Sequence, residues 1–244
     1  AGTFTSGGSE SIFLAVQTAR DWARATKGIT QPNFIVPRTA HPAFSRAGHA
    51  LGIDVQRVPT TRNDFKADVG AIASKIDDNT IGIVGSAPCY PFGVFDPIRE
   101  LGALAQSHDL WLHVDACVGG FLSPYVKRLG HPVPDWDFSV PGVTSVSADL
   151  HKHGMAAKGA SLMMLRSKEL KEEYQTFDFR EWERGPYVAW TMQGTRPGGA
   201  VAAAWATLQH LGDEGYMRCA RMIMDNKKAL VGGVGRIPGL AVLE

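Results

Sequence analysis

The segment Thr144-Ser-Val-Ser-Ala-Asp-Leu-His-Lys-His-Gly154 joins a short β-branched run to a lysine that has a histidine on either side. Lysine directly after a strand is unusual because lysines favour solvated helix faces, and a lone lysine here is most often surface decoration. In a desolvated pocket, however, the pKa of a lysine falls and its amine becomes a nucleophile. The segment therefore predicts a strand over residues 144–147 followed by a candidate nucleophile, Lys152.

The same change from an apolar run to a polar loop recurs along most of the chain. Further strands are predicted at residues 34–36, 54–58, 81–84, 110–114 and 162–165. Amphipathic stretches between them predict helices from about residue 9 through 23, and at 43–51, 69–76, 97–106 and 200–211. Strands that alternate with helices predict an α/β fold with a mostly parallel central sheet. Such sheets bind ligands beyond the carboxyl ends of their strands.

The C-terminal part of the sequence has a different organisation. Two helical patterns, at 200–211 and from 213 to about 230, precede the Gly/Pro-rich stretch 232–239. We expect a large domain over residues 1–231 and the start of a smaller C-terminal domain at 232–244. The chain has no initiator Met and opens directly into a glycine-rich loop, so we expect an N-terminally truncated fragment of a longer protein.

Composition narrows the functional classes. A formal net charge of +1 over 244 residues, with no Lys/Arg tract, argues against nucleic-acid binding. Three widely separated cysteines show neither metal-ligand spacing nor a disulfide framework, which favours no metal and a reducing, cytoplasmic compartment for this segment. No apolar run approaches the ~20 residues of a membrane span.

Three further sites suit ligand chemistry. Thr5-Ser-Gly-Gly-Ser-Glu10 is a glycine-rich helix entry whose N–H groups suit an anion, with Ser9 as a further donor or as the helix N-cap; a simple turn is the alternative. Asp115 ends an apolar strand and would lie at the carboxyl edge of the sheet, unless it only caps the next helix. His41 follows the first predicted strand, where a histidine is otherwise a cap or a packed side chain.

Taken in order, five motifs resemble the sphingosine-1-phosphate lyase family of pyridoxal-phosphate (PLP) enzymes. They are Thr5-Ser-Gly-Gly-Ser-Glu10, Ala40-His-Pro-Ala-Phe44, His113-Val-Asp-Ala-Cys117, Ser147-Ala-Asp-Leu-His-Lys152 and Gly194-Thr-Arg-Pro-Gly198. The resemblance covers essentially the whole chain. It implies the large domain of the PLP-dependent transferase fold (fold type I) and pyridoxal 5'-phosphate as cofactor.

The resemblance also implies residue roles. Lys152 would be the Schiff-base lysine, Asp115 would pair with the pyridine nitrogen, and His41 would stack on the pyridine ring. The residues implied for the cofactor phosphate are Gly8, Ser9 and His151, together with Thr195, which would reach the phosphate of a neighbouring subunit. That last role implies a homodimer with shared active sites.

The implied reaction is the retro-aldol cleavage of a phosphorylated amino-alcohol lipid to a long-chain aldehyde and phosphoethanolamine. Lys158 is a candidate for the substrate phosphate, with a loop lysine in solvent as the alternative. His153 and Met155 replace two tyrosines that are usual in the family, so the acid/base group stays open and His153 is a candidate substrate contact. Some relatives carry a membrane anchor, so a eukaryotic parent would lie at the endoplasmic reticulum.

Two other functions are compatible with these residues. A glutamate-type or aromatic amino-acid decarboxylase would use the same lysine, aspartate and histidine, because both reactions leave a carbanion at the same carbon. A non-catalytic paralogue could serve as an interaction subunit. Retention of Lys152, Asp115 and His41 together argues against that last interpretation.

Overall fold

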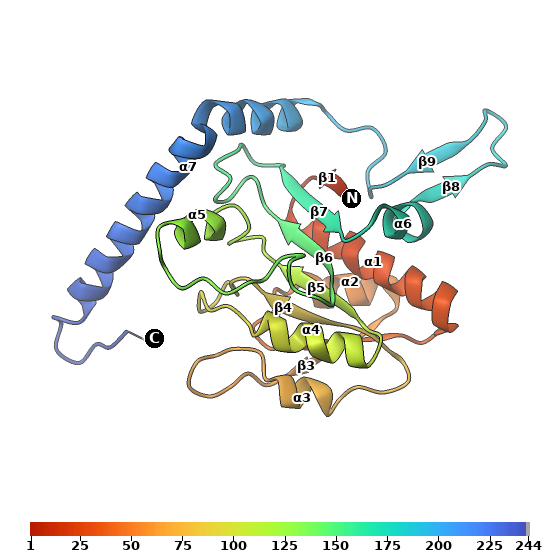
Figure 1. Ribbon diagram of the computed structural model, residues 1–244. Helices are drawn as coiled ribbons and strands as arrows, with labels where there is room; N and C mark the ends of the chain where they lie inside the picture. Colours follow the sequence, from red (N-terminus) through yellow and green to blue (C-terminus); the bar gives the residue numbers. More distant parts are fainter. Residues whose placement is uncertain (243–244) are drawn as a thin grey trace.

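The protein, described by a computed structural model over residues 1–242, is built on a seven-stranded sheet with the order β1-β7-β6-β5-β4-β2-β3 (Figure 1). The strands from β2 to β6 run parallel, whereas β7 is antiparallel to both of its neighbours, β6 and β1. The bounds of the strands are Gly2–Thr5 (β1), Asn33–Pro37 (β2), Asp54–Val58 (β3), Thr80–Ser86 (β4), Trp111–Asp115 (β5), Val143–Ala148 (β6) and Ser161–Leu165 (β7). The predicted α/β class with a mostly parallel sheet is confirmed.

Helices cover both faces of the sheet, as parallel strands require. The helices α1 (Gly8–Lys27) and α2 (Ala43–Leu51) pack on one face, and α3 (Val69–Ala73) and α4 (Ile98–Ser107) pack on the other (Figure 1). Strand β2 shows how the sequence fills both layers, because side chains alternate along a strand. Phe34 and Val36 join the core under α1, whereas Ile35 belongs to the core under α4.

Several predicted elements match closely, and the differences have local causes. The strand at 54–58 and the helix at 43–51 have the predicted bounds, and the other predicted strands differ by at most two residues at either end. Helix α3 ends three residues early, and Ser9 lies inside α1 because Gly7 is the N-cap. Strand β1 was not predicted, and neither were α5 (Ser123–Arg128), α6 (Lys168–Leu170) with the π-helical turn Lys171–Gln175, or the hairpin of β8 (Phe177–Phe179) and β9 (Tyr187–Ala189).

The two predicted C-terminal helices lie on either side of a kink at Gly212, and together they make up α7 (Gly199–Val234). Gly212 has φ 55° and ψ −172°, a conformation that glycine adopts without steric cost. Near this point Tyr216 donates a buried hydrogen bond to the Gly154 carbonyl, and α7 extends away along one side of the protein (Figure 1). The helix continues three residues beyond the expected domain boundary at 231, and the division into domains stays a prediction.

Membrane insertion by a helix was tested on the same residues. Over residues 1–242 no helix, the 36-residue α7 included, is both long and apolar enough to span a bilayer.

Candidate active site

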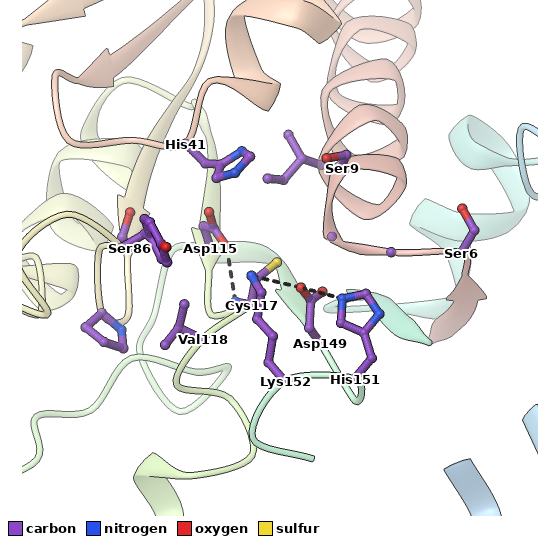
Figure 2. Close-up of a pocket in the computed structure, with 15 residues that line it drawn as sticks. Ser6, Ser9, His41, Ser86, Asp115, Cys117, Val118, Asp149, His151 and Lys152 are labelled. Carbon is purple, nitrogen blue, oxygen red and sulfur yellow. Dashed lines mark hydrogen bonds and ion pairs between the residues drawn. The ribbon is translucent and has the colours of Figure 1, made fainter. Parts of the chain in front are cut away.

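The carboxyl ends of β4, β5 and β6 meet the N-terminus of α1 around a cavity of about 400 Å³ (Figure 2). Parallel α/β sheets place ligands at this edge. Six of the nine residues implied by the motifs line the cavity: Gly8, Ser9, His41, Asp115, His151 and Lys152. Its other lining residues are Ser6, Gly7, Ile12, Ser86, Pro88, Tyr90, Cys117, Val118 and Asp149.

Asp115 is the last residue of β5 and is only 9% exposed. Its Oδ1 accepts a hydrogen bond of 3.1 Å from the Cys117 N–H and one of 3.4 Å from the Ser147 hydroxyl. Two residues earlier, His113 faces the same side of the sheet, with its ring nitrogens 2.8 and 3.2 Å from the hydroxyls of Ser145 and Ser147. Burial lowers the pKa of His113 to about 4, so the imidazole is neutral, and it connects to the Asp115 carboxylate through the Ser147 hydroxyl.

His41 combines the two roles that its sequence position suggested as alternatives. Its Nδ1 accepts the Ala43 N–H at 3.1 Å, which is a cap at the start of α2, and its carbonyl accepts from Arg57 at 3.3 Å. The ring nevertheless lies at the cavity on the side opposite Lys152 (Figure 2). The cap therefore orients a ring that remains available to a ligand.

The start of α1 brings backbone close to the cavity floor. A Cβ placed on Gly8 would lie 2.8 Å from both Asp149 Oδ2 and Cys117 Sγ, so only glycine fits there without displacement. The first N–H groups of a helix lack intrahelical acceptors and attract anions. Glu10 does not compete for them, because its Oε2 accepts from the N–H and the hydroxyl of Ser6.

Lys152 lies in the turn after β6 and points its amine into the cavity (Figure 2). Its Nζ is 3.0 Å from Asp149 Oδ2, and His151 Nε2 is 3.4 Å from the same oxygen. Burial opposes the charge of Lys152, but the attraction of the Asp149 and Asp115 carboxylates outweighs it and raises the pKa of Lys152. The expectation of a lowered pKa is therefore wrong for this arrangement, because the pocket also contains a carboxylate.

Sequence reasoning assigned no role to Asp149, although it belongs to the motif that identified Lys152. It is 2% exposed, and its Oδ1 has no hydrogen-bond partner among residues 1–242. The available signal was its spacing: an acid three residues before a lysine in a turn brings the two side chains together.

The remaining motif residues lie outside this cavity. His153 does not line the cavity, and its Nδ1 donates at 2.8 Å to the carbonyl of Val118, which does. Lys158 is exposed and lines a neighbouring cavity with Arg196, which hydrogen-bonds to the Phe4 carbonyl. Thr195 is exposed and lines neither cavity. Within one chain, these three residues are not brought to the amine of Lys152.

Comparison with known proteins agrees with this geometry. Residues 1–236 match the pyridoxal-dependent decarboxylase conserved domain. Sphingosine-1-phosphate lyases from Oryza sativa subsp. japonica and Drosophila melanogaster are 47% and 40% identical over 99% of the chain, which spans 44% of each relative's length. The structure of a Burkholderia pseudomallei sphingosine-1-phosphate lyase superposes with a TM-score of 0.96 at 42% identity, over 99% of this chain and 55% of that one.

A glutamate decarboxylase of Lactobacillus brevis, 24% identical over 98% of this chain and 56% of that one, shares the fold with a TM-score of 0.84. The domain match covers nearly all of the chain, and the cavity lies where this fold binds its ligands. The chain belongs to the pyridoxal-dependent decarboxylase family and is a homologue of sphingosine-1-phosphate lyases.

Proposed function

We propose that the full-length protein is a PLP-dependent carbon–carbon lyase that cleaves a sphingoid-base 1-phosphate into a long-chain aldehyde and phosphoethanolamine. The observation that carries the proposal is the convergence of Lys152, Asp115 and His41 on one cavity. It occurs in a chain 40–47% identical to sphingosine-1-phosphate lyases. The chain spans less than half of those relatives, so activity, substrate and partners of the whole protein are proposals.

The residues around the cavity suit pyridoxal phosphate. An amine and a carboxylate face one volume of about 400 Å³, and a helix N-terminus with two glycines opens onto it. The buried Oδ1 of Asp149 has no hydrogen-bond partner among residues 1–242, and the close approach of the backbone at Gly8 forms a cradle that a Cβ would fill. When bound, the cofactor supplies an electron sink for the broken bond.

Each side chain then has a defined task. Lys152 would hold the cofactor through its amine, and Asp115, kept as a carboxylate, would bind the protonated ring nitrogen. His41 would cover the ring face. Gly8 and Ser9 at the α1 N-terminus, with His151, would bind the cofactor phosphate.

Cleavage removes the proton of the 3-hydroxyl, breaks the Cα–Cβ bond, and returns a proton to Cα. We assign no residue to the first proton transfer, because His153 does not line the cavity and its Nδ1 is bonded to the Val118 carbonyl. Lys158 and Arg196 supply positive charge in the adjoining cavity, which shares Ser6 with the first. We propose Lys158 for the substrate phosphate, and His153 as a support for the substrate-side wall.

Amino-acid decarboxylation is the second candidate. A probable L-aspartate decarboxylase of Thermococcus gammatolerans is 38% identical over the whole chain and 62% of its own length. The same lysine, aspartate and histidine would serve that reaction. The higher identity to the lyases favours carbon–carbon cleavage.

We also propose a homodimer in which Thr195 reaches the neighbouring subunit's cofactor phosphate, since Thr195 is exposed and outside its own cavity. A cytoplasmic position for this segment, and anchoring of a eukaryotic parent at the endoplasmic reticulum, complete the proposal. Sedimentation of the full-length protein with and without Thr195→Ala tests the assembly, and fractionation of cells tests the location.

The activity is tested with the full-length protein, pyridoxal phosphate and sphinganine 1-phosphate. We expect equal amounts of a long-chain aldehyde and phosphoethanolamine, and neither product from Lys152→Ala. Carbon dioxide released from aspartate, glutamate or an aromatic amino acid, without aldehyde from the lipid, would overturn the proposal.

A further inference from the structure

We propose that Asp149 is a positioning residue that fixes the charge and direction of Lys152 and the tautomer of His151. The inference rests on attachment of the cofactor at Lys152, which is part of the proposed function, and does not depend on the substrate. Asp149 follows β6 directly and faces the cavity, where its Oδ2 contacts both Lys152 and His151 (Figure 2).

The contacts of His151 determine which ring nitrogen carries the proton. The Ala160 N–H donates to Nδ1 at 3.2 Å, so Nδ1 must be unprotonated. Burial lowers the pKa of His151 despite the nearby carboxylate, so the ring is neutral near pH 7 and its proton lies on Nε2. That proton faces Asp149 Oδ2 at 3.4 Å. Ala160 and Asp149 therefore select the tautomer with the proton on Nε2, which the cofactor phosphate of the proposed function would take over from the long contact to Asp149.

Asp149 cannot easily turn away from this position. Gly8 and Cys117 close the space on its other side, because a Cβ on Gly8 would be within 2.9 Å of both carboxylate oxygens. A buried carboxylate needs a cation or several donors, and Lys152 at 3.0 Å is the cation in contact with it. The ion pair thus fixes the direction of the Lys152 amine before any ligand arrives.

The charge of Asp149 dominates the surroundings of the Lys152 amine. The other titratable groups that face this pair are Asp115 at the end of β5, Cys117 after it, His41 across the cavity, His151, and Lys158 beyond His151. Burial and the two carboxylates raise the pKa of the Cys117 thiol, which stays neutral. Asp115 is committed to the ring nitrogen in the proposed function. Asp149 is the counter-ion left for the lysine nitrogen, whether free or attached to the cofactor.

The test compares Asp149→Asn, which keeps the shape and removes the charge, with the wild-type full-length protein. Asp135→Asn is the matched control, because Asp135 pairs with Lys127 and Arg99 at the surface. The absorbance of the lysine-bound cofactor is followed against pH, since it reports protonation of the attached nitrogen. We expect the midpoint to fall by about 1–3 pH units in Asp149→Asn, the usual effect of an adjacent opposite charge, and to stay unchanged in the control.

A second readout uses cofactor-free protein. The rate at which acetic anhydride acetylates Lys152, quantified by peptide mass spectrometry, is proportional to the fraction of Lys152 whose amine is uncharged. We expect the wild-type midpoint to lie above the ordinary lysine pKa of about 10.4. In Asp149→Asn, acetylation at pH 8 should be about tenfold faster or more, because burial then lowers the pKa of Lys152 with much less opposing attraction from a carboxylate.

Two outcomes would overturn the inference. They are an unchanged absorbance midpoint in Asp149→Asn, or a wild-type acetylation midpoint below the ordinary value. If Asp149→Asn does not fold, as judged by circular dichroism, Asp149→Ser takes its place, because it removes the same charge without added volume. If neither variant folds, the wild-type acetylation midpoint decides alone. Absence of cofactor attachment to wild-type Lys152 would instead contradict the proposed function, so the two failures are distinguishable.

Discussion

Replacement of Gly8 by alanine is expected to disrupt the site through one methyl group. The added Cβ would lie 2.8 Å from Asp149 Oδ2 and Cys117 Sγ, and 2.9 Å from Asp149 Oδ1, well inside normal contact. Neither neighbour moves freely, because both are buried and Asp149 is held by Lys152. Overpacking of this kind typically costs about 1–3 kcal/mol. Relief by displacement of α1 would also move the helix N-terminus proposed to bind the cofactor phosphate.

The neighbouring glycine provides a matched control. A Cβ on Gly7 would meet only His151 Cε1, at the ordinary contact distance of 3.4 Å. Urea unfolding and a pyridoxal phosphate titration, followed by absorbance, should be measured for both variants. Gly8→Ala should lose about 1–3 kcal/mol of unfolding free energy and bind cofactor at least tenfold more weakly, whereas Gly7→Ala should remain near wild type. Equal effects of the two substitutions, or an unperturbed Gly8→Ala, would refute the reasoning.

Three further substitutions test the surroundings of the site. The pKa of His113 is about 4 in the folded state, against 6.5 in the unfolded state. Between pH 6.5 and 4 the folded state therefore binds fewer protons, so the free energy of unfolding falls as the pH drops, by up to about 3 kcal/mol. His113→Gln should lack this loss when urea unfolding is measured at each pH. Asp96, with a pKa of about 6, adds the opposite slope to both proteins and so cancels in the difference between them. A difference that does not change with pH would argue against the assignment. Asp115→Ala should weaken cofactor binding by about 2 kcal/mol or more, read from equilibrium titration, and unchanged affinity would exclude the ring-nitrogen contact. Tyr216→Phe should cost about 1 kcal/mol by losing the bond to Gly154, and an equally stable variant would show that this bond does not hold α7.

Local pattern was sufficient for much of the fold. The helix at 43–51 has its predicted bounds because its buried residues repeat with helical spacing, and the strand at 54–58 has its predicted bounds although only Val58 in it is buried. Strand β1 was missed because its partner, β7, lies some 160 residues away in the chain, and the four residues have no pattern of their own. The antiparallel direction of β7 likewise depends on tertiary pairing, whereas the two C-terminal helices were predicted and lie on either side of the kink at Gly212.

The residues of the candidate site were predictable from the sequence, but their arrangement in space was predictable only in part. Lys152, Asp115 and His41 meet in one cavity because each lies at or after the carboxyl end of a parallel strand, and those ends meet at one edge. Asp149 was overlooked because its significance depends on burial and on the close approach of Gly8, which spacing alone does not reveal. The position of Lys158 in the neighbouring cavity was also not predictable from spacing, because the loop that carries it turns toward α7.

The most direct test of the central claim is the identity of the lysine that carries the cofactor. The full-length protein should be loaded with pyridoxal phosphate, reduced with borohydride and digested for peptide mass spectrometry. The account predicts a single reduced adduct on Lys152, absent from Lys152→Ala. An adduct on another lysine such as Lys158, or no adduct in the loaded wild-type protein, would contradict it.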